Sequence, residues 1–244
     1  MSALIDYTLH LADNALLLGQ RNSEWCGHGP ILEQDIAITN ISLDLIGQAR
    51  SLYQYAAQLK ADGSTEDSLA YLRTEREFKN CLLVEQPNGD WAQTILRQFL
   101  FSSYQYYLYN YLQSNSDKTI AAIAEKSLKE VSYHLRWSSE CVIRLGDGTE
   151  ESRNRMMTAI DELWRYTGEL FIASPYETEL GIDLTSLKTE WDKKVNAVME
   201  EATLPVPEKV FMQTGGKNGT HTEQLGYILA DLQYMQRAYP GCEW

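Results

Sequence analysis

The sequence predicts an all-α protein, and three observations support this fold class. Apolar residues recur at spacings of three and four over long stretches, which is the period of an amphipathic helix. No stretch alternates apolar and polar residues with the period of two that is typical of a strand. The breaks between helical stretches are short and rich in Gly, Pro, Asn and Asp, as turns are. We expect four long helices with short turns to form a bundle, followed by about three additional C-terminal helices.

The first two helices are expected at about residues 5–21 and 31–59. The segment "GHGP" separates them, and Pro30 suits the start of a helix because its missing N–H costs nothing there. The second helix carries a helical apolar stripe, made by Ile38, Ile41, Leu45, Leu52, Ala56 and Leu59. This stripe is expected to face the bundle interior.

The third and fourth helices are expected at about residues 91–113 and 118–145. A short helical or irregular piece and the turn "QPNGD" precede the third helix, which is apolar around most of its girth. A helix of that kind is buried, or lies between its own domain and a partner. Ser116 is expected to cap the fourth helix, and Gly146 to end it.

Three accessory helices are expected at about residues 149–172, 184–202 and 222–239. Thr220 and Glu223 have the spacing of a capping box before the last one. We expect a single domain over residues 1–244, with the core bundle at about 5–145 and the accessory helices at about 149–239.

Composition and charge exclude several functional classes. The chain has 244 residues and is 44% hydrophobic, with no apolar run long enough for a membrane span and no signal-peptide pattern. Its four cysteines form no CxxC pair, so a cytoplasmic protein is predicted. The net charge of −13, with dispersed Lys and Arg, disfavours nucleic-acid binding. An anionic ligand would require a local basic pocket.

A di-iron site in a four-helix bundle requires a Glu from each of two helices and a Glu-x-x-His pair from each of the other two. The chain contains no Glu-x-x-His, and the third predicted helix contains no Asp or Glu. Only Glu130 and His134, four residues apart, together with Asp44 on the second helix, remain as degenerate positions. We therefore predict no metal site in this chain, and His28 beside Cys26 is interpreted as a structural turn.

Two interpretations of Glu130 and His134 stay open. In the first they belong to a buried polar network with Arg136 or Asp44. In the second Glu130, His134 and Asp44 hold a metal, and the chain is an autonomous metal-binding oxygenase.

Two further segments carry basic residues. "TGGKNGTH", residues 214–221, places glycines and Lys217 before a helix N-terminus, where an anion is favoured; a flexible loop with a helix cap is the alternative. "RTEREFKN", residues 73–80, combines Arg73, Arg76 and Lys79 with Phe78. It suits phosphate and adenine, or it is a solvated connection.

The chain resembles the PaaC family, the structural subunits of bacterial phenylacetyl-CoA epoxidase. The resemblance covers the chain from the first helix to "QRAYPGCEW" and rests on "LADNALLLGQRNSEWCGHGP", "DIAITNISLDLIGQARSLYQYAA", "LLVEQPNGDWAQTILRQ", "EVSYHLRW", "ELWRYTGELF" and "TGGKNGTHTEQLG". It implies a ferritin-like fold and a cytoplasmic, NADPH-dependent multicomponent monooxygenase that epoxidises the ring of phenylacetyl-CoA in phenylacetate degradation.

The resemblance also implies partners, cofactors and site residues. A related subunit, PaaA, carries the di-iron centre and pairs with this chain, and a separate reductase holds flavin and an iron–sulfur cluster and takes electrons from NADPH. No cofactor and no catalytic residue is expected in this chain. Residues near the CoA substrate at the subunit interface are expected to be Glu77, Phe78, Lys79, Asn80, Thr178, Glu179, Leu180 and Lys217. A CoA-thioester binding module without an oxygenase partner is a further alternative.

Overall fold

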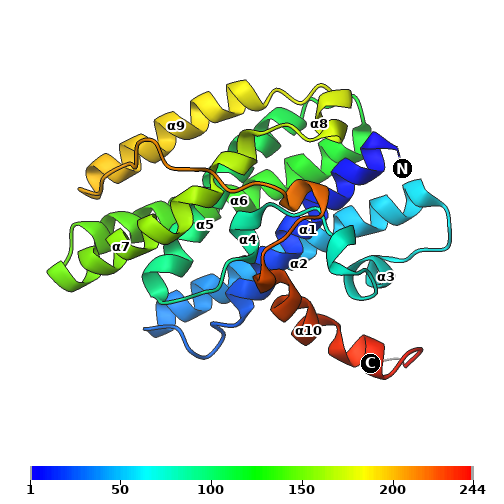
Figure 1. Cartoon of the computed structure of the whole chain (residues 1–244), viewed down its shortest axis with the longest axis horizontal. Helices are drawn as coiled ribbons and strands as arrows, with labels where there is room; N and C mark the ends of the chain where they lie inside the picture. The colour runs from blue at the N-terminus through cyan, green and yellow to red at the C-terminus, as the bar shows by residue number, and fades with distance from the viewer. Residues whose placement is uncertain (1, 243–244) are drawn as a thin grey trace. The chain divides into compact units, whose positions relative to one another are not determined.

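The computed structural model describes residues 2–242, and within them all regular structure is helical (Figure 1). This confirms the all-α prediction, and the long helices are consistent with a ferritin-like helical fold. None of the helices in this part of the chain is both long and apolar enough to cross a membrane.

The described residues divide into two compact units. Unit 1 contains the chain up to Pro87, the segment from Ala173 to Ile182, and the chain from Thr214 onward. Unit 2 contains the segments 88–172 and 183–213. The expected single domain over residues 1–244 stays a prediction.

Unit 1 is built on two long helices, α1 (Ala3–Ser23) and α2 (Leu32–Lys60), which pack along each other. Ser2 caps α1 by accepting a hydrogen bond from the backbone N–H of Ile5, and α2 ends where Ala61 takes a left-handed conformation. The smaller elements of the unit are α3 (Glu66–Tyr71), the 3-10 turn η1 (Glu75–Glu77), α4 (Leu82–Glu85), α8 (Pro175–Glu179), η4 (Gly216–Asn218) and α10 (Glu223–Ala238).

Unit 2 is built on α5 (Trp91–Leu112) and α6 (Lys118–Gly146), which also pack along each other. Most of the girth of α5 is buried, as its apolar sequence predicts. The indole N–H of Trp191, on α9 (Leu184–Glu201), donates to the Leu100 carbonyl oxygen at 2.9 Å and thereby links α9 to α5. The remaining elements are α7 (Glu150–Leu163), η2 (Trp164–Tyr166) and η3 (Gly168–Phe171).

Three local predictions are wrong. Asp117, not Ser116, caps α6 by accepting from the N–H groups of Thr119 and Ile120. The helix expected at 149–172 ends at Leu163 and continues as two 3-10 turns. The chain passes close to Met212 there, since a Cβ on Gly168 would lie 2.6 Å from the Met212 Cγ atom.

The capping box expected from Thr220 and Glu223 is also wrong, because Thr222 is the N-cap of α10. Its N–H and hydroxyl donate to the distant Glu85 Oε1 at 2.7 and 2.8 Å. A local sequence pattern cannot reveal a carboxylate supplied from another segment.

Candidate functional site

A cluster of polar side chains in unit 1, all largely buried except the half-buried Lys79, joins five segments of the sequence. We call it the polar cluster. The segments are α1, α2, the stretch that runs from α3 through α4, α8, and the loop before α10. Its members are His10, Asp13, Asn14, Tyr53, Arg73, Lys79, Asn80, Glu85, Glu177, Lys217 and His221. Buried polar groups are costly unless they are paired, so the hydrogen bonds of each member decide its role.

Asp13 lies at the centre of the first half of the polar cluster and is completely buried. Both terminal nitrogens of Arg73 donate to its carboxylate, the Tyr53 hydroxyl donates at 2.5 Å, and the Lys79 N–H donates at 2.8 Å. Burial alone would lower the pKa of Arg73, but Asp13 raises it above its ordinary value. The bidentate ion pair therefore anchors the connection to α1.

Two further residues of α1 hold the same connection. The His10 Nδ1 atom lies 2.6 Å from the Lys79 carbonyl oxygen, and the Asn14 side-chain oxygen accepts from the Cys81 N–H at 2.8 Å. Burial lowers the pKa of His10 to about 4, so its ring is neutral at pH 7 and Nδ1 carries the donated proton.

Glu177 and Lys217 form the second buried ion pair, with both Glu177 oxygens 3.0 Å from the Lys217 ammonium nitrogen. Burial would raise the pKa of Glu177, but His10 once it is protonated at low pH, the charge of Lys217 and the N–H of Ser174 lower it below its ordinary value. The Tyr176 hydroxyl donates to the Lys217 carbonyl oxygen at 3.2 Å. These bonds join α8 to the loop before α10.

His221 and Glu85 close the polar cluster on the side of α10. The two ring nitrogens of His221 lie 2.8 Å from Glu85 Oε2 and 3.0 Å from the Phe78 carbonyl oxygen. Both neighbours accept, so both nitrogens carry protons and the ring is cationic. Although burial opposes the charge, the bonds to Glu85 and Phe78 raise the pKa of His221 above its ordinary value.

The two buried histidines are expected to give opposite pH dependences of stability. His10 has a folded pKa of about 4 against 6.5 unfolded, so the stability that its neutral ring contributes is lost as pH falls from 6.5 to 4, by about 3 kcal/mol. The raised pKa of His221 means that its stabilisation is complete below pH 6.5 and is lost as pH rises through the folded pKa.

Urea unfolding of the wild type, His10→Gln and His221→Gln checks both expectations when it is followed from pH 4, for His10, to pH values well above 6.5, for His221. The difference in unfolding free energy between wild type and His10→Gln should shrink as the pH falls. The corresponding difference for His221→Gln should shrink as the pH rises. Parallel curves for the two variants would contradict the protonation states assigned here.

The residues predicted to lie near the substrate come together in unit 1, although the sequence placed them in three segments. The Lys79 ammonium nitrogen lies 5.5 Å from the centre of the Tyr176 ring on α8. The next residue of α8, Glu177, forms the ion pair with Lys217, so α8 contacts both other segments. Phe78, Asn80 and Lys217 are buried and hold the framework. Glu77, Thr178, Glu179 and Leu180 are exposed, and Lys79 is half-buried. Their proximity to a substrate stays a prediction.

Two cations of the basic segments, Lys217 and Arg73, are neutralised by buried carboxylates of the same unit. Lys217 is buried and bonded to Glu177, so its charge is neutralised within unit 1. The Arg73 guanidinium lies over the Phe78 ring at 4.1 Å and is bonded to Asp13, so neither side chain faces a phosphate or an adenine. Of the two interpretations of segment 73–80, the contacts of these two residues do not favour the phosphate-and-adenine site.

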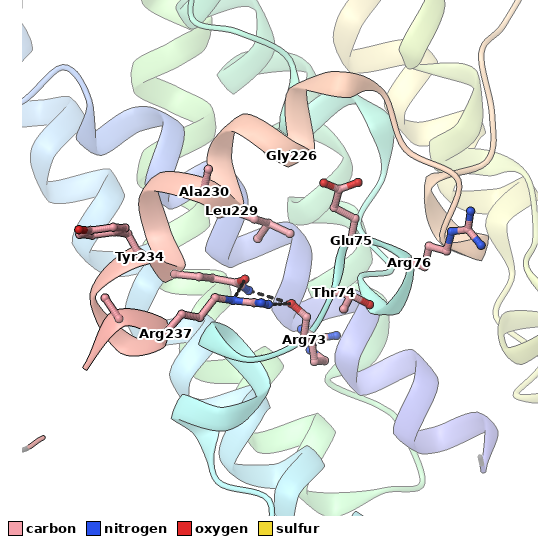
Figure 2. A pocket seen from close by; sticks show the side chains of 11 residues that line it. Arg73, Thr74, Glu75, Arg76, Gly226, Leu229, Ala230, Tyr234 and Arg237 are labelled. Carbon is pink, nitrogen blue, oxygen red and sulfur yellow. Dashed lines mark hydrogen bonds between the residues drawn. The ribbon is translucent and has the colours of Figure 1, made fainter. Parts of the chain in front are cut away.

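A groove of about 870 Å³ runs between residues 73–76 and α10 (Figure 2). Arg237 reaches across from α10 and donates to the Arg73 carbonyl oxygen at 3.0 Å, while its Nε atom donates to the Gln233 side chain at 2.9 Å. Gly226, Leu229 and Ala230 add an apolar part to the lining, and Arg76 and Glu75 carry opposite charges beside it. The groove lies next to the predicted substrate-side residues in the sequence.

The degenerate metal positions lie on two helices. Asp44 is half-buried on α2 in unit 1, whereas Glu130 is half-buried and His134 is buried on α6 in unit 2. Burial, together with the charge of Glu130, raises the pKa of Tyr109 on α5 to about 12, although the Gln105 amide opposes the rise. No group of three or more His, Cys, Asp or Glu side chains within residues 2–242 is placed to hold a metal ion.

His28 belongs to a structural turn, as predicted. Its Nδ1 atom lies 3.1 Å from the Cys26 carbonyl oxygen, and the Asp35 carboxylate accepts from the N–H groups of Gly27 and Gly29 at 3.2 and 2.9 Å. The turn is thereby fixed to the first turns of α2.

Sequence reasoning missed all three acidic members of the polar cluster. Asp13, Glu85 and Glu177 are not among the predicted site residues, although all three are completely buried. One signal was available for Asp13. The run "LHLADNALLL" places three polar residues at helical spacing inside an otherwise apolar helix, which predicts a buried polar contact.

Comparison with known proteins identifies the family of the chain. The chain matches the family model PaaA_PaaC, described as phenylacetic acid catabolic protein, over residues 1–244. It is 48% identical over 249 aligned residues, covering 100% of both chains, to the C subunit of the 1,2-phenylacetyl-CoA epoxidase of Escherichia coli (strain K12). A full-length match of this identity shows the family. The chain belongs to the phenylacetic acid catabolic protein family.

Proposed function

We propose that the chain is the non-catalytic structural subunit of a cytoplasmic phenylacetyl-CoA epoxidase, acting in aerobic phenylacetate degradation. It pairs with the di-iron catalytic subunit, PaaA, and stabilises it. The proposed reaction is supported by the 48% identical relative, which is a subunit of 1,2-phenylacetyl-CoA epoxidase. The proposed partner of related fold is supported by the family model, whose name joins PaaA and PaaC.

The composition of α5 is the observation that carries the non-catalytic role. A di-iron centre in this kind of bundle needs about four carboxylates to neutralise and bridge two metal ions. The segment Trp91–Leu112 contains neither Asp nor Glu. Its buried polar residues include the cationic Arg97 and the neutral Gln98 and Gln105, and a buried cation opposes a second one nearby. The donor set of this chain therefore does not fit two iron ions.

The side chains exposed around the polar cluster support a role beside the CoA substrate. The chain as a whole carries a net charge of −13, which repels the phosphates of CoA. Arg76 is exposed, and Lys79 is half-buried with its ammonium 3.5 Å from Asp6. These cations, together with Thr178 to Leu180, are the part of the chain best suited to line the substrate site at the subunit interface.

Metal analysis of separately and jointly purified subunits tests the proposal. We expect the chain alone to contain no stoichiometric iron, and its complex with PaaA to contain iron in proportion to PaaA. His134→Ala should leave the iron content and activity of the complex unchanged and alter only the stability of this chain. Stoichiometric iron in the chain alone, lost in His134→Ala, would establish the autonomous oxygenase instead.

Calorimetry with phenylacetyl-CoA separates the proposal from a free-standing CoA-binding module. The complex should bind the thioester and the chain alone should not. In the complex, Lys79→Ala should raise KM by roughly 5-fold with little change in kcat, because a charge-assisted contact is worth about 1 kcal/mol. Tight binding by the chain alone would favour the module.

A further inference from the structure

One face of α2 exposes large aliphatic side chains along four helical turns. We call Leu32, Ile36, Leu43 and Ile46 the α2 stripe. Their exposed fractions are 71%, 52%, 63% and 40%. Spacings of four, seven and three residues place them on one side of the helix. Single exposed apolar residues are ordinary, but four large ones on one face of a helix, interrupted only by the half-buried Thr39, mark an interaction surface.

The opposite side of α2 is already buried. Ile38, Ile41 and Leu45 are completely buried, and α2 packs along α1 within unit 1. A helix that is apolar on two sides has more apolar surface than its own unit covers. The α2 stripe extends over about 21 Å at 1.5 Å per residue, which suits the length of a second helix packed along it.

The charges beside the first turns of the α2 stripe are negative. Arg50 follows the stripe on the same face, one turn beyond Ile46, and is paired with Glu66 at 3.6 Å. No Lys or Arg occurs between Arg21 and Arg50, whereas Glu33 and Asp35 lie on either side of the stripe. The N–H groups of Gly29 and Gly27 lower the pKa of Asp35, so its carboxylate is ionised at pH 7. A second copy of this chain would bring acidic side chains against acidic side chains, which is unfavourable.

We propose that the α2 stripe is the docking surface for a helix of a different subunit, one with an apolar face flanked by Lys or Arg. This inference rests on the proposed function, under which that subunit is PaaA. The aliphatic side chains form the dry centre of the interface, and Glu33 and Asp35 form its polar rim. The rim charges determine the choice of partner and speed association at low salt.

Matched variants of the full chain test the docking surface. Leu43→Glu should raise the dissociation constant of the complex with PaaA by about 10-fold or more, because a charge would be buried at the centre of the interface. Tyr227→Glu is the control, since Tyr227 is also 63% exposed and lies on a helix of the same unit. Glu33→Lys should slow association and reduce its salt dependence. All three variants should unfold at the wild-type urea concentration.

The outcomes separate this inference from the proposed function. If the wild type and both glutamate variants bind PaaA equally well, the docking surface is wrong and the proposed function stands. If the wild type does not bind PaaA at all, the proposed function fails. If Leu43→Glu instead dissociates a homodimer of the chain, the occupant is a second copy and the inference is overturned.

Discussion

Replacing Asp13 with asparagine is expected to lower the free energy of unfolding by about 3 to 5 kcal/mol. The variant keeps the shape of the side chain but removes the charge that neutralises Arg73. The Arg73 guanidinium is 8% exposed and cannot reach water without breaking its bonds to the Leu69 and Glu77 carbonyl oxygens. A buried cation without its counter-ion is among the most destabilising changes a chain can carry.

Urea unfolding at pH 7 measures the effect of Asp13→Asn. Glu140→Gln is the matched control, because it makes the same chemical change in the exposed pair with Arg144 on α6. We expect the control to change stability by no more than about 0.5 kcal/mol. A loss below about 1 kcal/mol in Asp13→Asn would mean that Asp13 is not the counter-ion that holds Arg73.

Glu177→Gln is expected to cost about 3 to 5 kcal/mol for the same reason, since it leaves the Lys217 ammonium buried and unneutralised. The double variant Glu177→Gln/Lys217→Met should be clearly more stable than Glu177→Gln alone. Methionine keeps most of the volume of the lysine side chain. Because the double variant has neither charge, it leaves no buried charge without a counter-ion.

A double-mutant cycle with Lys217→Met measures the interaction between the two charges. We expect a coupling energy of about 2 kcal/mol or more, because the groups are in direct contact and fully buried. If the cost of the double variant equals the sum of the two single costs, the charges do not interact. The bonds between α8 and the loop before α10 would then owe their stability to Tyr176 and the backbone.

The long helices could be predicted within one or two residues, because helical periodicity and end signals are local properties of the sequence. The predicted ranges 91–113 and 118–145 correspond to Trp91–Leu112 and Lys118–Gly146. Two of the three wrong local predictions occur where a distant group decides the local structure, whereas the cap of α6 differs from the prediction by a single residue. Glu85 takes over the role of a cap at Thr222, and the close approach of Met212 accompanies the change from helix to 3-10 turns near Gly168.

The candidate site was predicted less completely than the fold. The segments around Lys79 and Lys217 were identified by their basic residues, and the family resemblance implied that they lie near the substrate, but their partners were not predicted. Asp13 and Arg73 are separated by 60 residues, and Glu177 and Lys217 by 40. Nothing in either local sequence identifies the other residue, so the sequence could not show that Lys217 and Arg73 are neutralised rather than free to bind an anion.

The sequence by itself determined the all-α fold class, the lengths of the main helices and the lack of carboxylates on α5. These are properties of residue type and spacing along one segment. The tertiary structure decided which charges are buried and paired, and which apolar face of α2 is left exposed. Burial and pairing depend on residues brought together from distant parts of the chain, so only the folded units show that the two buried ion pairs hold the framework and that the α2 stripe faces outward.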